Sequence, residues 1–355
     1  MTTSPRPQTN LRFEWVDYVK GLGIVLVVIG HTLRGLINAG LLESSPASQF
    51  ADDWIYAFHM PLFFFLSGLF AEHSFRKGPV PFVADKLRTI AYPYIIWASL
   101  QTGVQILLSG YVNQSLSWHD LLKIVYQPPM QFWFLYALFG CSLAFLGCRQ
   151  LGLGKLGFFV MAVAAAVAQT WGVLGSWGVI NQVGSNLPYF ALGVVTFPRI
   201  RNVMSNVNWR SNVAITITSY GLMTFIVLAG NSSEFQSRVI AAPLGIAATL
   251  SFAGLLEQTH ILKWVQYLGQ ASLPIYVAHT LASAGFRIVM QKFAHVNDPM
   301  FHLMGGVLAG LLIPILLNVI APRVGFPYLF SWPRRTTVVK TDDDVHECLV
   351  SVGTV

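Results

Sequence analysis

Apolar runs close to the length of a membrane-spanning helix recur along the chain, and they constrain it more than any single motif does. A helix needs about 20 predominantly apolar residues to cross the hydrocarbon core of a bilayer. Because the runs are continuous rather than alternating, they favour helices over a transmembrane barrel. We predict an all-α fold, a polytopic membrane helix bundle of about ten transmembrane helices. The runs lie at about residues 20–38, 54–72, 90–110, 131–148, 156–174, 187–198, 211–230, 237–256, 272–290 and 300–320.

The scarcity of charged residues agrees with this fold. They make up 10% of the 355 residues, whereas soluble globular domains carry about 25%. So few charges cannot give a chain of this size a polar surface. The net charge of +7 is spread over short segments between the apolar runs, so we expect contact with membrane lipids and no nucleic-acid partner.

The positions of the cations predict the orientation of the chain. If the N-terminus is cytoplasmic, 17 of the 22 lysines and arginines fall on the cytoplasmic side, as the positive-inside rule requires. We therefore expect both termini in the cytoplasm and three regions: a cytoplasmic N-terminal segment at 1–15, a membrane domain at 16–322 and a cytoplasmic tail at 323–355. The three cysteines lack paired spacing, so we expect neither a disulfide framework nor a metal site.

The first apolar run carries ionisable residues at helical spacing. Asp17 and Lys20 are three residues apart and share a helix face. His31 follows Lys20 by eleven residues, which is about 16 Å along a helix. Two interpretations stay open: an interfacial anchor pair with a structural histidine, or a charged entrance for an anionic cofactor followed by a buried base. Histidine suits the second role because its ordinary pKa lies near neutrality.

Four further stretches combine polar and apolar groups, and structural roles also explain each of them. "FHMPLFFFLSGLF" holds His59 and "LGQASLPIYVAHT" holds His279. The basic stretch at 75–94 suits lipid headgroups or phosphates, and "FWFLYALF" suits a packing face. The sequence has no P-loop, GxSxG, HExxH or CxxC motif.

Taken together, these stretches resemble the acyltransferase 3 family of membrane O-acyltransferases, and most closely the branch that acetylates exopolysaccharide and lipid-linked sugars. The resemblance covers about residues 12–320. The family pattern of an arginine, ten residues and a histidine is similar to "KGLGIVLVVIGH", with Lys20 where arginine is commoner. Other family motifs are matched in order by "RFEWVDYVKG", "FHMPLFFFLSG", "ADKLRTIAYPY", "FWFLYAL" and "LGQASLPIYVAHT".

The resemblance implies a reaction and a set of site residues. Acetyl-CoA would bind from the cytoplasm as the donor co-substrate, without a metal, and its acetyl group would pass to a hydroxyl of an extracytoplasmic or lipid-linked polysaccharide. His31 would act as general base or acetyl relay and Asp17 would orient Lys20, while His59 and His279 would line the acceptor side or share proton transfer. The residues implied for the coenzyme phosphates are Lys20, Arg76, Lys77, Lys86 and Arg88.

On the acceptor side, the candidates are aromatic. Trp133 lies in a family motif, whereas Trp118 and Trp177 suit either stacking on sugar rings or anchoring at the membrane interface. The resemblance implies the inner membrane of a bacterium. A transporter or flippase of sugar-linked lipids is the alternative, because such proteins also bury ionisable groups. The paired, interrupted helices typical of transporters are not evident in the sequence.

Overall fold

The computed structural model describes residues 13–108, 117–173, 175, 177–230 and 235–332. Helices joined by short connections make up this part of the chain, and it contains no strand. The predicted all-α class is therefore confirmed. Most of the two expected cytoplasmic segments, at 1–15 and 323–355, lies outside the described residues.

Long helices provide the frame and short ones turn the chain between them. The short elements are α3 (Ala71–Phe75), α4 (Pro79–Lys86), the π-helix η1 (Leu87–Ala91), α6 (His119–Lys123), the 3-10 helix η2 (Met130–Phe132), α12 (Lys263–Gln270) and the 3-10 helix η3 (Ala321–Val324). The long helices are α1 (Glu14–Asn38), α2 (Pro46–Leu69), α5 (Tyr92–Leu107), α7 (Trp133–Gln150), α8 (Lys155–Thr170), α9 (Gly178–Asn206), α10 (Trp209–Ala229), α11 (Phe235–Thr259), α13 (Ser272–Lys292) and α14 (Pro299–Ile320).

Seven helices in the described part of the chain are long and apolar enough to cross a membrane. They correspond to seven of the ten runs expected from the sequence. The other three runs, at 90–110, 156–174 and 187–198, fall on α5, α8 and α9. The first two of these helices have 16 residues each, fewer than a perpendicular crossing needs, and α9 carries Arg199 and Arg201 near its end. The count of about ten therefore stays a prediction.

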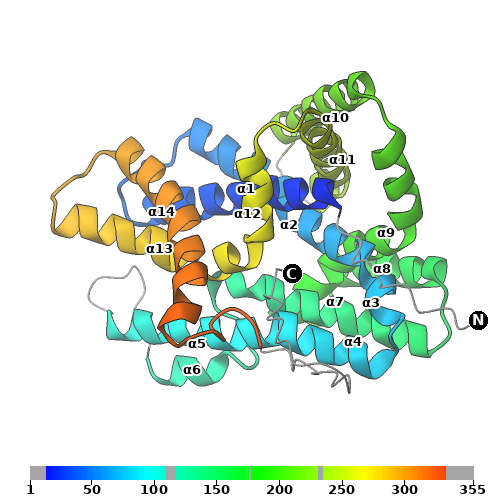
Figure 1. Cartoon of the computed structure of the whole chain (residues 1–355), viewed down its shortest axis with the longest axis horizontal. Coiled ribbons are helices and arrows are strands. Elements are labelled where there is room, and N and C mark those ends of the chain that lie inside the picture. Colours follow the sequence, from blue (N-terminus) through cyan, green and yellow to red (C-terminus); the bar gives the residue numbers. More distant parts are fainter. Residues whose placement is uncertain (1–12, 109–116, 174, 176, 231–234, 333–355) are drawn as a thin grey trace, which may run out of the picture.

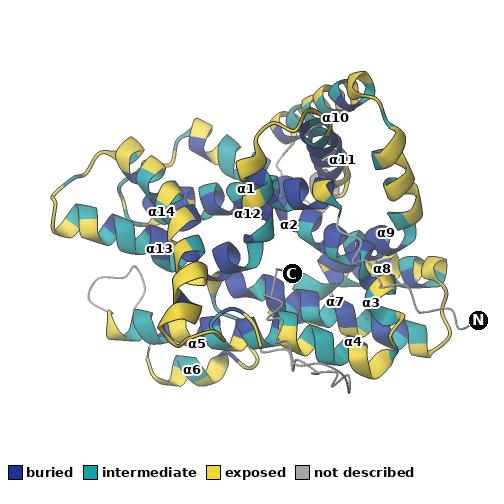
Figure 2. Cartoon of the chain, in the orientation of Figure 1, coloured by how far each residue is buried: buried dark blue, intermediate teal, exposed yellow. Residues whose placement is uncertain are grey.

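The outward surface of α14 shows that the bundle is built for an apolar solvent. Met304, Leu308, Leu312 and Leu316 recur every four residues and are each between 53% and 63% exposed. In water such an exposed apolar stripe would promote aggregation, whereas in a bilayer it faces lipid tails. Figure 2 shows the same contrast, with buried residues where α1, α2 and α12 meet and exposed residues along α14. The chain is an integral membrane protein.

Helix α1 lies at the centre of the bundle. It packs against α2, α11, α12, α13 and α14, and Figure 1 shows it in the middle of the molecule, with α10 and α11 on one side and α5 and α7 on the other. Its residues enter both apolar cores, Val27 and Val28 in one and Val16 and Val19 in the other. Polar groups on α1 are therefore enclosed by several helices.

The turn from α1 into α2 is specified locally. Ser45 caps α2, accepting a hydrogen bond from the Ser48 backbone N–H at 3.2 Å, and Ser48 Oγ accepts one from the Ser45 N–H at 2.9 Å. This capping box satisfies two backbone donors at the helix start, and Pro46 has a φ angle suited to the first helical position. Helix α2 thus begins at the end of the bundle where α1 ends. We call this end the α1 C-terminal face and the opposite end the α1 N-terminal face.

Glycines let α12 approach the backbone of α1 directly. A Cβ added at Gly269 would lie 1.8 Å from the carbonyl oxygen of Asp17, and one added at Gly21 would lie 2.0 Å from that of Val265. Small residues at such crossings are typical of helix packing in membranes. This contact fixes the start of α1 and, through α12, the start of α13.

Replacing either glycine should loosen this crossing. We expect Gly21→Ala and Gly269→Ala each to cost about 1–3 kcal/mol, because backbone atoms have to move apart. Thermal unfolding in detergent, followed by size-exclusion chromatography, measures the fall in Tm. Gly35→Ala is the matched control on α1, because nothing lies within 4 Å of its added Cβ, and its Tm should not fall. Equal stability of all three variants would contradict the close-packing account.

Candidate functional site

Three helices bring three histidines together inside the bundle. His31 lies on α1, His59 on α2 and His279 on α13. The ring centroids of His31 and His279 are 5.2 Å apart. The ring of Tyr56 joins His59 to this pair, because its centroid lies 4.5 Å from that of His59 and 6.1 Å from that of His31. We call these four residues the imidazole cluster.

Backbone contacts fix the tautomers of two of the rings. His59 Nδ1 lies 2.7 Å from the carbonyl oxygen of Ile55, and His279 Nδ1 lies 2.8 Å from that of Tyr276. A carbonyl oxygen only accepts, so each Nδ1 carries the proton and donates, which leaves the lone pair of each neutral ring on Nε2. Within the described residues, Nε2 of His279 is buried and has no hydrogen-bond partner.

The three rings differ in access. His59 and His279 are fully buried, whereas His31 is half-buried. A reacting molecule can therefore reach His31 with less rearrangement than the other two. A set of three histidines raises the possibility of a metal centre, but no group of His, Cys, Asp or Glu in the described chain is arranged to hold a metal ion. The arrangement suits proton transfer.

An ion pair connects the imidazole cluster to the α1 C-terminal face. Arg34 lies one helical turn beyond His31, and its Nε and Nη2 donate to the two carboxylate oxygens of Asp52 at 2.6 and 2.7 Å. The same guanidinium lies over the ring of Tyr56, 3.3 Å from its centroid. A bidentate pair that also stacks on an aromatic ring has a fixed geometry.

A buried polar network supports the other side of the cluster. The Gln131 side-chain amide donates at 2.8 Å both to Oε1 of Gln101 and to Oγ1 of Thr280. Thr280 donates in turn to Gln101 Oε1 at 2.7 Å, and Tyr276 donates to the Gln131 carbonyl. The network links α5, η2 and α13, and its members on α13 flank His279. It holds this imidazole against the bundle.

Asp17 and Lys20 lie at the α1 N-terminal face. Asp17 is buried at 7% exposure where α12 crosses α1, and Lys20 is half-buried. Eleven residues separate Lys20 from His31, or about 16 Å of helix. Lys20 and His31 therefore lie at different depths along α1.

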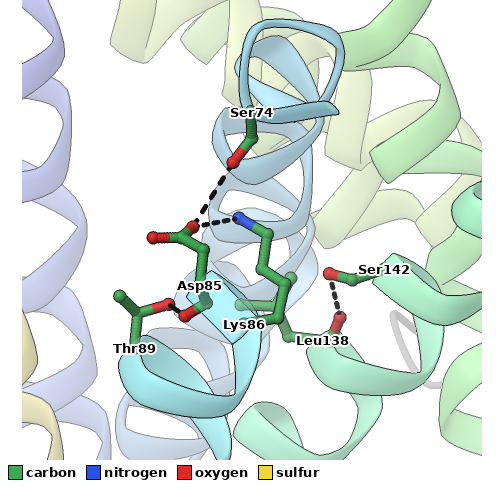
Figure 3. Close-up of polar contacts among 6 residues, drawn as sticks. All are labelled: Ser74, Asp85, Lys86, Thr89, Leu138 and Ser142. Atoms are coloured by element: carbon green, nitrogen blue, oxygen red, sulfur yellow. Dashed lines mark hydrogen bonds and ion pairs between the residues drawn. The ribbon is translucent and has the colours of Figure 1, made fainter. Parts of the chain in front are cut away.

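Four of the five basic residues predicted to bind phosphates lie in the segment after α2 at 76–88, which we call the corner. Arg76, Lys77 and Arg88 are exposed there. Lys86 is held more firmly, because its Nζ lies 3.4 Å from Asp85 and 5.3 Å from the centroid of the Phe82 ring. Figure 3 shows Ser74 of α3 donating to the same Asp85 carboxylate, which ties α3 to α4.

A π-helix begins at the end of this corner. Residues Leu87–Ala91 form it, and the Thr89 hydroxyl donates to the Asp85 carbonyl at 2.8 Å. Single π-turns within α-helices are frequent at functional sites. Here the wider turn includes Arg88, one of the four cations between residues 76 and 88.

The three tryptophans expected on the acceptor side are dispersed. Trp133 stacks on Phe64 with centroids 6.4 Å apart, a packing role inside the bundle. Trp118 is 63% exposed and Trp177 is 46% exposed, and Trp177 donates from Nε1 to the Tyr126 carbonyl at 2.9 Å. Trp133 is connected to the imidazole cluster through two rings, because Phe134 lies between Trp133 and Tyr276, and Tyr276 contacts His279 with centroids 6.2 Å apart.

Sequence reasoning missed three residues that the structure joins to the cluster: Tyr56, Arg34 and Asp52. Helical spacing contains a signal for the first two, since Arg34 follows His31 by three residues and Tyr56 precedes His59 by three. Asp52 belongs to the acidic "ADDW" segment, and only the pairing of α1 with α2 brings it to Arg34.

The fold and the cluster together define an integral membrane protein that holds three histidines and a tyrosine inside its helix bundle. The family model described as "Acyltransferase domain" matches residues 13–319, which include the whole imidazole cluster. The chain belongs to the acyltransferase 3 family of membrane acyltransferases.

Three curated proteins are similar to this chain. It is 24% identical to the nodulation protein NolL of Mesorhizobium japonicum over 95% of both chains. It is 25% identical to the inner membrane protein YcfT of Escherichia coli, over 78% of this chain and 81% of that protein. It is 32% identical to NolL of Sinorhizobium fredii, over 52% of this chain and 48% of that protein. No solved structure gives a significant match.

The polar network of Gln101, Gln131 and Thr280 should stabilise the folded protein. We expect Gln131→Leu to cost about 2 kcal/mol, because the buried Gln101 and the half-buried Thr280 each lose a hydrogen-bond partner. Tm in detergent should fall by a few degrees. The control is Gln105→Leu, on α5 one turn beyond Gln101, where the side chain is only half-buried and bonded to the Met130 sulfur at 3.1 Å. A stability change as small for Gln131→Leu as for the control would contradict the network's role.

Proposed function

We propose that the chain is an O-acetyltransferase that moves an acetyl group from acetyl-CoA to a sugar hydroxyl. The donor enters at the α1 N-terminal face, which is cytoplasmic, and the acceptor enters at the α1 C-terminal face. The observation that carries the proposal is the imidazole cluster, where His31 lies between the two faces beside two fully buried histidines. Membership of the acyltransferase 3 family supports the reaction class.

The donor side is argued from charge and shape. The phosphates of acetyl-CoA need cations, and Arg76, Lys77 and Arg88 are exposed at the corner after α2. Helix α2 runs from the α1 C-terminal face, so this corner lies toward the end where α1 begins, as Figure 1 illustrates. Lys20 is in the second turn of α1. The thin pantetheine arm then spans the distance of about 16 Å from Lys20 to His31.

The cluster supplies the chemistry of transfer. His31 takes the proton from the acceptor hydroxyl, and the hydroxyl oxygen attacks the carbonyl carbon of the thioester. The bond from carbon to sulfur breaks, and the proton passes to the departing thiolate. The products are an acetyl ester and coenzyme A. His279 lies close enough to share the proton, and His59 lies on the far side of Tyr56. The fixed tautomers of both rings suit them to accept a proton at Nε2.

The acceptor and the membrane are argued from the resemblance and one relative. The acyltransferase 3 branch that the motifs resemble acetylates polysaccharide sugars. One relative, YcfT, is described as an inner membrane protein, and we propose the same location for this chain. Asp17 remains the proposed orienting group for Lys20.

Removing the central imidazole should abolish transfer without unfolding the protein. We expect His31→Gln to lower the rate at least about 100-fold, the usual contribution of a general base, with Tm in detergent near that of the wild type. The measurement is release of coenzyme A from labelled acetyl-CoA with acceptor present.

The exposed His119 gives the control, because His119→Gln removes an imidazole outside the cluster. Full activity of His31→Gln would refute the assignment. A wild-type protein that moves sugar-linked lipid across vesicle membranes and transfers no acetyl group would identify a transporter instead.

The basic corner should govern donor binding and leave the chemical step alone. We expect Arg88→Ala to raise the KM for acetyl-CoA about tenfold with little change in kcat, since a phosphate contact is made equally in the ground state and the transition state. Steady-state kinetics at low salt measure this. Arg201→Ala removes a comparable exposed cation from α9 and should leave KM unchanged. A fall in kcat with constant KM would contradict a role in donor binding.

A further inference from the structure

A hollow opens at the α1 C-terminal face between the end of α1 and the start of α2. Its volume is about 430 Å³, which lies within the range of small-molecule sites. The sides come from the last turn of α1, from the 39–45 connection and from the first two turns of α2. The polar residues that line it include Arg34, Asn38, Ser44, Gln49, Asp52 and Asp53.

The lining chemistry indicates the kind of ligand. Hydroxyl, amide, carboxylate and guanidinium groups face one space, so it offers both donors and acceptors. The formal charge of the lining is −1, from one arginine and two aspartates. This charge disfavours phosphates and carboxylates. It suits a neutral polyol, because each of its hydroxyls donates one hydrogen bond and accepts others.

Part of this site is built before any ligand arrives. The Arg34 guanidinium is held by two hydrogen bonds to Asp52 and by the face of Tyr56. Gln49 is held as well, donating to Ser44 Oγ at 3.1 Å. A ligand that binds such side chains loses less entropy in ordering them.

Tyr56 links the hollow to the imidazole cluster. Arg34, which lines the hollow, covers one part of its ring, and the rings of His31 and His59 lie edge-on to it. Within the described chain, the Tyr56 hydroxyl is buried and has no hydrogen-bond partner. Buried polar atoms are normally paired, so this hydroxyl is a natural partner for a group that enters from the hollow.

We propose that this hollow binds the acceptor, and that the acceptor presents a neutral sugar unit. Its hydroxyls bond to the Arg34–Asp52 pair and its neighbours, and the reacting hydroxyl passes Tyr56 to reach His31. This inference rests on the proposed acetyl transfer to a sugar. The inference adds two statements to that proposal: the sugar binds in this hollow, and the sugar carries no charge.

The test uses the full chain purified in detergent with labelled acetyl-CoA. The probes are the neutral and the acidic unacetylated carbohydrate fractions from a strain lacking the gene. Asp52→Asn breaks the ion pair with Arg34 and keeps the size of the side chain. Asn38→Ala alters the lining of the hollow and leaves the Arg34–Asp52 pair intact. We expect both variants to raise the KM for the neutral fraction about tenfold or more, with an unchanged KM for acetyl-CoA.

The control is Asp120→Asn on α6. It breaks an equally short ion pair, with Lys123 at 2.7 Å, outside the hollow, and should leave the KM for the neutral fraction as in the wild type. An unchanged acceptor KM in both hollow variants would overturn the site, and labelling of the acidic fraction alone would overturn the neutral sugar. Failure of the wild type to label either fraction would overturn the transferase and this site with it.

Discussion

The interior of a bilayer offers no hydrogen-bond partner, so a polar side chain placed there has to find one within the protein. This chain meets the requirement in two ways. His59 and His279 donate to backbone carbonyls of their own helices, and Gln131 closes a network across three elements. Two buried atoms in the described chain stay without a partner at the cluster, the Tyr56 hydroxyl and Nε2 of His279. These two atoms are available to bond to a substrate that enters the proposed site.

The order of residues along α1 relates the structure to the proposed reaction. Lys20 lies near the start of the helix, His31 about 16 Å further on, and Arg34 one turn beyond that. Cations at one end suit a phosphorylated donor, and the mixed polar hollow at the other end suits a neutral sugar. Glycine contacts with α12 fix where α1 begins. The packing of this short helix therefore sets the depths of Lys20, His31 and Arg34 in the bundle.

The sequence predicted the helical class and the position of most long helices, because apolar runs of spanning length have a direct physical meaning. It also singled out His31, His59 and His279, since ionisable residues in such runs are rare. Their convergence was not readable, because it depends on which helices pack on α1. Asp52 was missed for the same reason. Trp118 and Trp177 are exposed in the structure, and their role, stacking on a sugar or anchoring at the membrane interface, stays a prediction.

The most direct test of this account is a density map of the protein with a non-hydrolysable acetyl-CoA analogue bound. The account predicts that the analogue enters past Lys20 and that its acyl carbon lies against the ring of His31, within the bundle. An acyl end held elsewhere, with His31 closed off by side chains or facing lipid, would contradict it.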